Sequence, residues 1–239
     1  MKVFAAVLAG GIGSRMGKQI PKQYIEICGR PVIIRTLDTF LKEDVFNHIV
    51  LLTPEEWVPY TEKLIDEYIG KNSKITVLKG GETRNDTLEN AINYLDSEFG
   101  FEEDTVIVTH DAVRPFLTSE IIEKNIEAAA DCGACGTMVP STDTVVVSSD
   151  SEYIDRIPDR SELFMCQTPQ TFNAVTLKKI MDSLTEEERA SVTDGCRLFV
   201  MKNLPVRMVE GIPENIKITY PFDLTVAEAV VAEREGGDD

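Results

Sequence analysis

The sequence predicts an α/β fold in which one mostly parallel sheet carries helices on both faces. Short apolar runs rich in Val and Ile, typical of buried strands, alternate with longer segments whose apolar residues recur at helical spacing. Such alternation is characteristic of a parallel sheet built from strand–helix–strand units. With 239 residues, 43% of them hydrophobic, the chain is also long enough to bury a large core.

The first half of the chain supplies most of these elements. Strands are expected at Val3–Leu8, His48–Thr53, Ile75–Leu78 and Thr105–Thr109, and helices at Val32–Leu41, Glu55–Tyr68, Asp86–Phe99 and Ser119–Ala130. Right-handed crossovers bring the carboxyl ends of parallel strands to one edge of the sheet. Open α/β sheets bind their ligands at that edge, so we look there for functional residues.

The stretch from residue 141 to 160 breaks the alternation. Thr144–Ser148 and Tyr153–Ile157 have the pattern of two strands, and the polar turn Ser149–Glu152 joins them. A two-stranded hairpin is barely stable alone, so we expect this β-arm to protrude and to pack on a partner subunit or as its own unit.

Beyond the arm, a helix is expected at Thr176–Ser183 and another from Thr185, where Thr185 and Glu188 form a capping box. The polar tail Glu233–Asp239 is expected to fray. Because no repeat or long linker interrupts the chain, we expect a single domain over residues 1–239, with 141–160 as its arm.

Charge and composition exclude several classes of protein. The chain has 24 Lys and Arg against 41 Asp and Glu, a formal net charge of −17, and such a surface repels nucleic acid and anionic membranes. No apolar run reaches the roughly 18 residues of a membrane span, and the first apolar run lacks the features of a signal peptide. Five scattered cysteines suit a reduced compartment. We therefore expect a cytoplasmic protein that binds neither nucleic acid nor membranes.

A glycine-rich segment directly after the first predicted strand is the strongest local signal. It runs Leu8-Ala9-Gly10-Gly11-Ile12-Gly13-Ser14-Arg15-Met16-Gly17, and turns of this kind let backbone N–H groups approach a phosphate. The P-loop pattern fails because Ile12 stands at its first glycine, and the dinucleotide fingerprint fails because Met16 stands at its third. The nucleotidyltransferase signature fits, with Gly10-Gly11, Arg15-Met16 and Pro21-Lys22 in order. Arg15, Lys18 and Lys22 supply the local positive charge that a triphosphate needs.

Two further motifs follow predicted strands. Asp111 ends a buried strand at the expected ligand edge, where a carboxylate can hold Mg²⁺ against two phosphate groups. A helix N-cap or an ion pair with Arg114 is the alternative for Asp111, and His110 is expected to be a buried, hydrogen-bonded histidine. Gly80–Thr87 is a second glycine pair before a helix, and Arg84 with the start of that helix could contact a base or a ribose. A tight turn with an N-cap is the alternative there.

The cysteines predict no metal or redox site. Cys132 and Cys135 have C-x-x-C spacing, but Cys28, Cys166 and Cys196 do not supply the second pair that a metal site usually needs. Two histidines in the whole chain exclude a His-rich metal site.

Together these motifs resemble the cytidylyltransferases that make CDP-alcohols from CTP and a sugar-alcohol phosphate. The resemblance spans Val3 to about Ala232 and also rests on Gln167–Phe172, Thr193-Asp194 and Asn215–Thr219. It implies a Rossmann-like three-layer fold of the nucleotide-diphospho-sugar transferase type, Mg²⁺ as divalent cation, and a homodimer. Two other classes stay open. A dehydrogenase is disfavoured by the broken fingerprint, and a non-catalytic nucleotide-binding protein by the retained basic and acidic residues.

Two branches of that family are most similar. Leu8–Gly11, Ala112–Phe116 and Ile157–Arg160 resemble the ribitol-5-phosphate cytidylyltransferases, which act in teichoic acid synthesis for the cell wall. We therefore expect transfer of CMP from CTP to D-ribitol 5-phosphate, which gives CDP-ribitol and pyrophosphate. The alternative is the same chemistry on 2-C-methyl-D-erythritol 4-phosphate, in the isoprenoid pathway.

The resemblance also implies roles for individual residues. Arg15, Lys22, Arg160 and Lys217 are the implied catalytic residues, and Arg114, Arg160 and Lys217 bind the acceptor. Asp111 holds Mg²⁺. The implied CTP-binding residues are Leu8, Ala9, Gly10, Gly11, Gly81, Glu82, Thr83, Arg84, Asn85, Asp86, Thr87 and Ala112. The arm is exchanged between two subunits in this family, so Arg160 of each subunit is expected near the site of the other.

Overall fold

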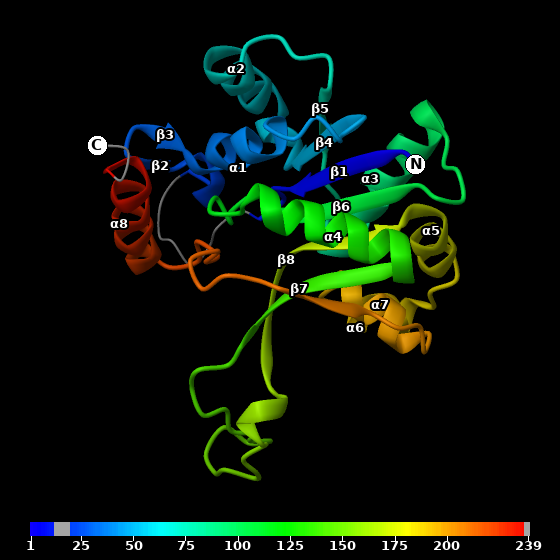
Figure 1. Ribbon diagram of the computed structural model, residues 1–239, viewed down its shortest axis with the longest axis vertical. Helices are drawn as coiled ribbons and strands as arrows, with labels where there is room; N and C mark the ends of the chain where they lie inside the picture. The colour runs from blue at the N-terminus through cyan, green and yellow to red at the C-terminus, as the bar shows by residue number, and fades with distance from the viewer. Residues whose placement is uncertain (12–19, 237–239) are drawn as a thin grey trace.

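The computed structural model describes residues 1–11 and 20–236, and it places seven strands in one sheet with the order β5-β4-β1-β6-β8-β7-β9 (Figure 1). Their bounds are β1 (Val3–Leu8), β4 (His48–Thr53), β5 (Ile75–Lys79), β6 (Val106–Asp111), β7 (Ala134–Pro140), β8 (Phe164–Asn173) and β9 (Arg207–Glu210). Strands β1, β4, β5 and β6 are mutually parallel, β7 is parallel to β9, and β8 is antiparallel to both of its neighbours. The predicted mostly parallel sheet is confirmed.

Eight α-helices are described, at α1 (Val32–Leu41), α2 (Val58–Tyr68), α3 (Arg84–Phe99), α4 (Ser119–Cys132), α5 (Ala174–Asp182), α6 (Glu186–Ser191), α7 (Gly195–Met201) and α8 (Pro221–Gly236). Short 3-10 turns lie at Lys22–Tyr24, Glu55–Trp57 and Arg160–Glu162, and a two-stranded sheet pairs β2 (Glu26–Ile27) with β3 (Arg30–Pro31). Among the described helices, none is long and apolar enough to cross a membrane.

Strand β1 shows why helices cover both faces of the sheet. Val3, Ala5 and Val7 belong to one buried apolar cluster, in which residues of α1 and α4 pack. The alternate residues Phe4, Ala6 and Leu8 belong to a second cluster, shared with residues of α3, α5 and α7. Side chains of a strand alternate between faces, so an all-apolar run is buried on both. The result is the three-layer arrangement that the sequence predicts.

Most predicted elements are found close to their expected bounds. β1, β4 and α1 coincide with them, and the predicted helix at 55–68 begins as a 3-10 turn before α2. The last strand of the first half ends at Asp111 rather than Thr109, so Asp111 belongs to β6 itself. The capping box of Thr185 and Glu188 is present at the start of α6. The tail was expected to fray from Glu233, but α8 continues to Gly236.

The predicted hairpin of the arm is reduced to one antiparallel bridge. Thr144–Ser148 and Tyr153–Ile157 form no strands, and within this described segment Val147 and Arg156 make one isolated antiparallel bridge. The Asp150 carboxylate accepts the N–H groups of Glu152 and Tyr153, so these backbone donors bond to a side chain instead of a strand partner. Figure 1 shows the segment projecting from the ends of β7 and β8, away from the sheet.

Candidate active site

A cavity of about 350 Å³ opens where β1 and β6 end and α3 begins. Its lining residues are Leu8, Ala9, Gly10, Gly11, Lys22, Gln23, Gly81, Glu82, Thr83, Arg84, Thr87, Asp111, Val113 and Lys217. The volume lies within the range of small-molecule sites, and the position is the carboxyl edge of the sheet where α/β folds bind ligands. The structure thus brings two glycine-rich turns and three basic side chains to one place.

Asp111 lies at the centre of the charged groups in this cavity. Lys217 Nζ donates to Asp111 Oδ2 at 2.6 Å, and Arg84 Nη2 is 3.8 Å from Oδ1. Burial raises the pKa of the Asp111 carboxyl, but Lys217 and Arg84 outweigh this effect and hold that pKa well below its usual range. The carboxylate is therefore charged at neutral pH. Its ion pairs are not with Arg114, whose Nη1 donates instead to the backbone oxygen of Asn215.

Lys22 reaches the cavity from a buried 3-10 turn. Its Nζ donates to the backbone oxygen of Ile218 at 2.7 Å, and the side chain is only 9% exposed. The neighbouring Gln23 is also buried, and its Nε2 donates to the backbone oxygen of Ala9 at 2.7 Å. Because Ala9 follows β1, this bond fixes the Lys22 turn to the first glycine-rich loop. Sequence reasoning gave no role to Gln23 or Val113, although Gln23 follows the Pro21-Lys22 pair and Val113 lies within the Ala112–Phe116 motif.

The second loop is held by side-chain bonds at the start of α3. Thr83 accepts from the Asp86 N–H while Asp86 accepts from the Thr83 N–H, which makes a capping box. The Gly81 N–H donates to Thr87 Oγ1 at 3.0 Å. A Cβ atom on Gly81 would lie 2.2 Å from the Asp86 Cβ, so this tight turn requires glycine. The cap that the sequence left as an alternative is present, and the loop still lines the cavity.

His110 is the buried histidine that the sequence predicts. Its Nε2 lies 3.0 Å from the backbone oxygen of Arg114, and its Nδ1 lies 3.0 Å from Thr168 Oγ1. A carbonyl only accepts, so Nε2 carries the proton and Nδ1 accepts from Thr168. Thr168 in turn accepts the N–H of Asp111 at 3.1 Å. Burial lowers the pKa of His110 to about 4, so this neutral ring orients β6 rather than supplying charge.

Some predicted site residues lie outside the cavity lining. Of the described ones, these are Asn85, Asp86, Ala112, Arg114 and Arg160. Asn85 donates to the backbone oxygens of Arg189 and Val192, which ties α3 to α6, and Ala112 is fully buried. Arg160 is exposed on the arm, where its Nη1 lies 3.4 Å from the Thr142 oxygen. Arg15, with the rest of 12–19, lies outside the described residues.

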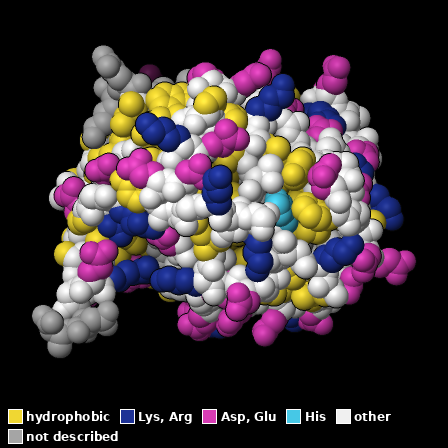
Figure 2. Space-filling view, turned by 90° about the horizontal axis from the view of Figure 1, so that it is seen from above, with side chains coloured by type: hydrophobic (Ala, Val, Ile, Leu, Met, Phe, Trp, Pro, Cys, Tyr) yellow, Lys and Arg dark blue, Asp and Glu magenta, His cyan; other side chains and the backbone are white. Residues whose placement is uncertain are grey.

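The surface around the fold carries mixed charge in spite of the net charge of −17. On the face drawn in Figure 2, basic and acidic side chains are interspersed. The grouping of Lys22, Arg84 and Lys217 in one cavity contrasts with that pattern. Three cations that line one cavity suit a ligand with several negative charges, such as a nucleoside triphosphate.

Comparison with known proteins identifies relatives along the whole chain. Residues 3–233 match the family model of 2-C-methyl-D-erythritol 4-phosphate cytidylyltransferase. The 4-diphosphocytidyl-2C-methyl-D-erythritol synthase of Anaerococcus prevotii is 30% identical, with 96% of both chains covered and a TM-score of 0.80. The 2-C-methyl-D-erythritol 4-phosphate cytidylyltransferase of Francisella tularensis is 27% identical (96% and 99% covered, TM-score 0.79). That of Thermus thermophilus is 25% identical (96% and 98% covered, TM-score 0.76).

Proposed function

The chain belongs to the 2-C-methyl-D-erythritol 4-phosphate cytidylyltransferase family, and from this premise we propose that it transfers CMP from CTP to 2-C-methyl-D-erythritol 4-phosphate. The family model and the relatives named above support this acceptor. The sequence motifs favour ribitol 5-phosphate as acceptor and a place in teichoic acid synthesis. The family model and these relatives support neither. Methylerythritol 4-phosphate, the alternative acceptor, therefore becomes the main proposal.

One observation carries the proposal: Lys22, Arg84 and Lys217 line one cavity together with Asp111 and two glycine-rich turns, and Arg84 and Lys217 pair with the Asp111 carboxylate. In the reaction, a phosphate oxygen of the acceptor attacks the α-phosphorus of CTP. A new P–O bond forms, the bond to the β-phosphate oxygen breaks, and pyrophosphate leaves. The attacking oxygen is already anionic, so the reaction needs alignment and positive charge more than a general base. The cavity supplies both.

The backbone of the two turns is suited to hold the triphosphate. Gly10 and Gly11 follow β1, and Gly81 with Thr83 precedes α3. In this proposal, the backbone N–H groups of the two turns face the phosphates. The start of α3 faces them too, because the amino end of a helix favours negative charge. Lys22 then stabilises the charge that develops at the α-phosphorus, and Lys217 holds the acceptor phosphate. Arg15 has the same role as Lys22 in this proposal.

Asp111 fits a divalent cation in the cavity. Mg²⁺ in proteins takes one or two carboxylates together with substrate phosphates, and Asp111 is a charged carboxylate on the cavity wall. Its present partners, Lys217 and Arg84, can transfer to phosphate oxygens when the triphosphate is bound. When bound there, Mg²⁺ would neutralise part of the phosphate charge.

The arm is the remaining part of the proposal. Arg160 lies outside the cavity lining in its own chain, and the segment around it exposes large apolar side chains, among them Tyr153 at 73% and Ile154 at 61%. Packing on a second copy of the chain would cover these side chains. We propose a homodimer in which Arg160 of each subunit completes the acceptor site of the other.

Ribitol 5-phosphate stays as a second candidate acceptor because of two sequence features. Val113 lines the cavity next to Asp111, in the Ala112–Phe116 segment that resembles the ribitol branch, and Ile157–Arg160 lies on the arm. Both segments are where an acceptor would be contacted under this proposal.

The test is pyrophosphate release from CTP and Mg²⁺ with each acceptor in turn. We expect kcat/KM with methylerythritol 4-phosphate to exceed that with ribitol 5-phosphate by at least about 100-fold, since matched polar contacts discriminate strongly. Release only with ribitol 5-phosphate would move the chain to the other acceptor. Release with neither acceptor, in protein that binds CTP, would contradict the proposal.

A further inference from the structure

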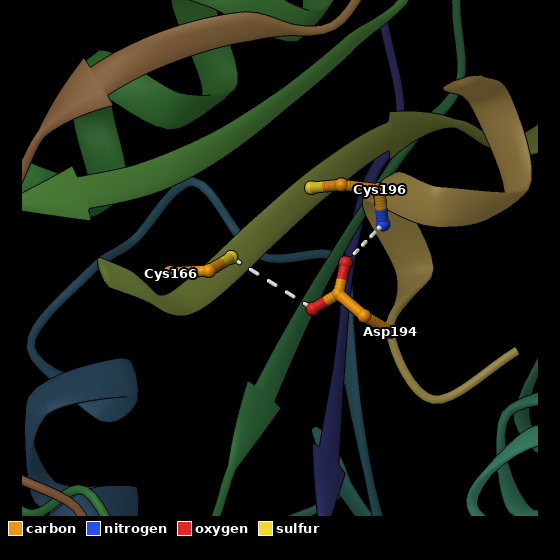
Figure 3. Close-up of side chains that lie close together, drawn as sticks. All are labelled: Cys166, Asp194 and Cys196. Carbon is orange, nitrogen blue, oxygen red and sulfur yellow. Dashed lines mark hydrogen bonds between the residues drawn. The ribbon is translucent and has the colours of Figure 1, made fainter. Parts of the chain in front are cut away.

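Two cysteines and an aspartate that are not part of the active-site cavity lining meet at the side of the sheet where α7 packs. Cys166 lies on β8, Asp194 is the N-cap of α7, and Cys196 lies in the first turn of that helix. One ligand atom from each lies within 4.8 Å of the other two. Figure 3 shows the two sulfur atoms and the carboxylate facing a common space between strand and helix.

The spacing in this cluster suits a tetrahedral metal ion. Cys166 Sγ lies 3.7 Å from Asp194 Oδ2. Zinc binds sulfur at about 2.3 Å and carboxylate oxygen at about 2.0–2.2 Å, so two such ligands on one ion are roughly 3.5 Å apart. This pair of atoms therefore already stands near the separation that an ion between them requires, and Cys196 Sγ lies within 4.8 Å of both.

The surrounding structure holds each ligand in place. Asp194 Oδ1 caps α7 by accepting the N–H groups of Cys196 and Arg197, which directs Oδ2 toward the sulfur atoms. The buried Gln170 accepts the Gly195 N–H through Oε1 and donates through Nε2 to both Asp194 Oδ2 and Cys166 Sγ. Outer partners of this kind orient metal ligands in many proteins.

Strand β7 leaves room for the inner cysteine. A Cβ atom on Gly136 would lie 2.7 Å from Cys196 Sγ, so glycine there lets the sulfur occupy its position. The Cys196 thiol and the Cys166 sulfur are hydrogen-bonded to each other across this space. A thiolate, rather than a thiol, is the form that binds metals.

The other cysteines do not share this arrangement. Cys132 Sγ donates to the backbone oxygens of Ala128 and Ala134, and Cys135 Sγ bonds to Asn125. The thiols of the C-x-x-C pair are thus hydrogen-bonded to groups of α4 and β7. The cluster joins residues from two elements that are 28 positions apart, which is why spacing in the sequence does not reveal it.

We propose that Cys166, Asp194 and Cys196 bind one Zn²⁺ ion per chain, with water as the fourth ligand on the exposed side of Cys166. Two thiolates favour a borderline-soft ion such as Zn²⁺ over Mg²⁺, which prefers oxygen ligands. Three protein ligands and one open position are a common zinc arrangement. The bound ion joins β8, at the base of the arm, to the start of α7.

The test titrates reduced, chelator-treated full-length protein with Zn²⁺, and with Co²⁺ as a spectroscopic probe. We expect one ion per chain, a rise in melting temperature with Zn²⁺, and a cobalt spectrum with thiolate charge-transfer absorption. Cys166→Ser should lower the affinity for Zn²⁺ at least about 100-fold. Loss of a partner that only orients a ligand already costs up to about 100-fold, and Cys166 is itself a ligand in this proposal. Cys28→Ser, which removes an exposed cysteine outside the cluster, is the matched control and should bind like the parent.

Because Cys166 is exposed, Cys166→Ser should fold, and equal melting temperatures of the metal-free variant and parent check this. Cys196→Ser gives an independent loss of the same site. Equal zinc affinity in Cys166→Ser and the parent would overturn the proposal, and so would a cobalt complex without thiolate absorption.

Discussion

Lys217 Nζ lies 2.6 Å from Asp111 Oδ2, although 106 residues separate the two in the sequence. Asp111 ends the central strand β6, and Lys217 comes from the segment between β9 and α8. The ion pair therefore ties the last part of the chain to the carboxyl edge of the sheet. It also keeps a lysine and a carboxylate side by side where, in our proposal, a phosphate and a divalent cation meet.

Asp111→Asn keeps the shape of the side chain and removes its charge. We expect kcat to fall at least about 100-fold at every Mg²⁺ concentration, because an amide is a poor ligand for Mg²⁺ and the charges of the cavity no longer balance. A Mg²⁺ titration of steady-state rates measures this. Asp131→Asn changes an exposed aspartate far from the cavity and is the control. Near-normal rates in Asp111→Asn would make Asp111 a purely structural residue.

Gly11→Ala separates ligand binding from folding. Among the described residues no atom lies within 4 Å of a Cβ placed on Gly11, so the free energy of unfolding should change by less than about 0.5 kcal/mol. Affinity for CTP should fall at least about tenfold, or 1.4 kcal/mol, because the methyl group occupies space that a phosphate needs. Thermal unfolding and CTP titration are the two measurements.

Gly236→Ala is the matched control, because a Cβ there also meets no described atom and Gly236 is not part of the cavity lining. Gly81→Ala should differ from both by losing stability, since its Cβ collides with Asp86. If Gly11→Ala binds CTP like the parent, the first loop does not hold the nucleotide.

The stability of the protein should fall as the pH drops from 7 to 5, in part because of His110. Burial lowers the pKa of His110 to about 4, whereas an unfolded histidine titrates near 6.5. Between these values the unfolded state binds more protons, so acidification favours unfolding, by about 1–2 kcal/mol for this group. Carboxylates with lowered pKa, such as Asp111, act at still lower pH.

Urea unfolding of the parent and of His110→Gln at pH 7 and pH 5 measures this effect. The free energy of unfolding should differ much less between pH 7 and pH 5 in the variant than in the parent, whatever the stability of the variant at pH 7. His48, whose pKa burial also lowers, accounts for the part that stays. An unchanged pH dependence in His110→Gln would show that the ring is not held neutral.

A dimer with shared sites can be tested by mixing two inactive variants. If Arg160 completes the site of the other subunit, Lys22→Ala and Arg160→Ala together form heterodimers with one intact site. Random pairing should then return about a quarter of the parent activity after co-expression. Mixing Lys22→Ala with Asp111→Asn is the control, because both changes lie in the cavity of one chain and no site is rebuilt. Equal rates in the two mixtures would contradict shared sites.

The sequence predicts the first half of the fold well because its strands are apolar runs that glycine, proline or polar residues bound. β1 and β4 are wholly buried, and Pro31 precedes α1. β8 escapes such reasoning, since Gln167, Thr168 and Gln170 are polar and yet buried. Their side chains are satisfied by distant partners, for example Ile212 for Gln167 and His110 for Thr168. Such partners are visible only in the folded chain.

The same distinction applies to the candidate site. The two glycine pairs, Lys22 and Asp111 could be found because each stands next to a predicted strand or a proline. No sequence pattern distinguishes Gln23, and its role in holding the first glycine-rich loop follows from one hydrogen bond to Ala9. The family resemblance implies that Asn85 binds CTP, but its side chain donates instead to the backbone oxygens of Arg189 and Val192.

The rate and CTP affinity of Lys22→Ala test the central claim most directly. That claim is that cations of this cavity stabilise the transition state of CMP transfer, and Lys22 is the one fixed beside the first loop. We predict that kcat falls by about 10²–10³ while CTP affinity falls by less than about tenfold, with Lys124→Ala, an exposed lysine elsewhere, as control. A kcat within about threefold of the parent would contradict the claim, because Lys22 would then contribute nothing specific to the transition state.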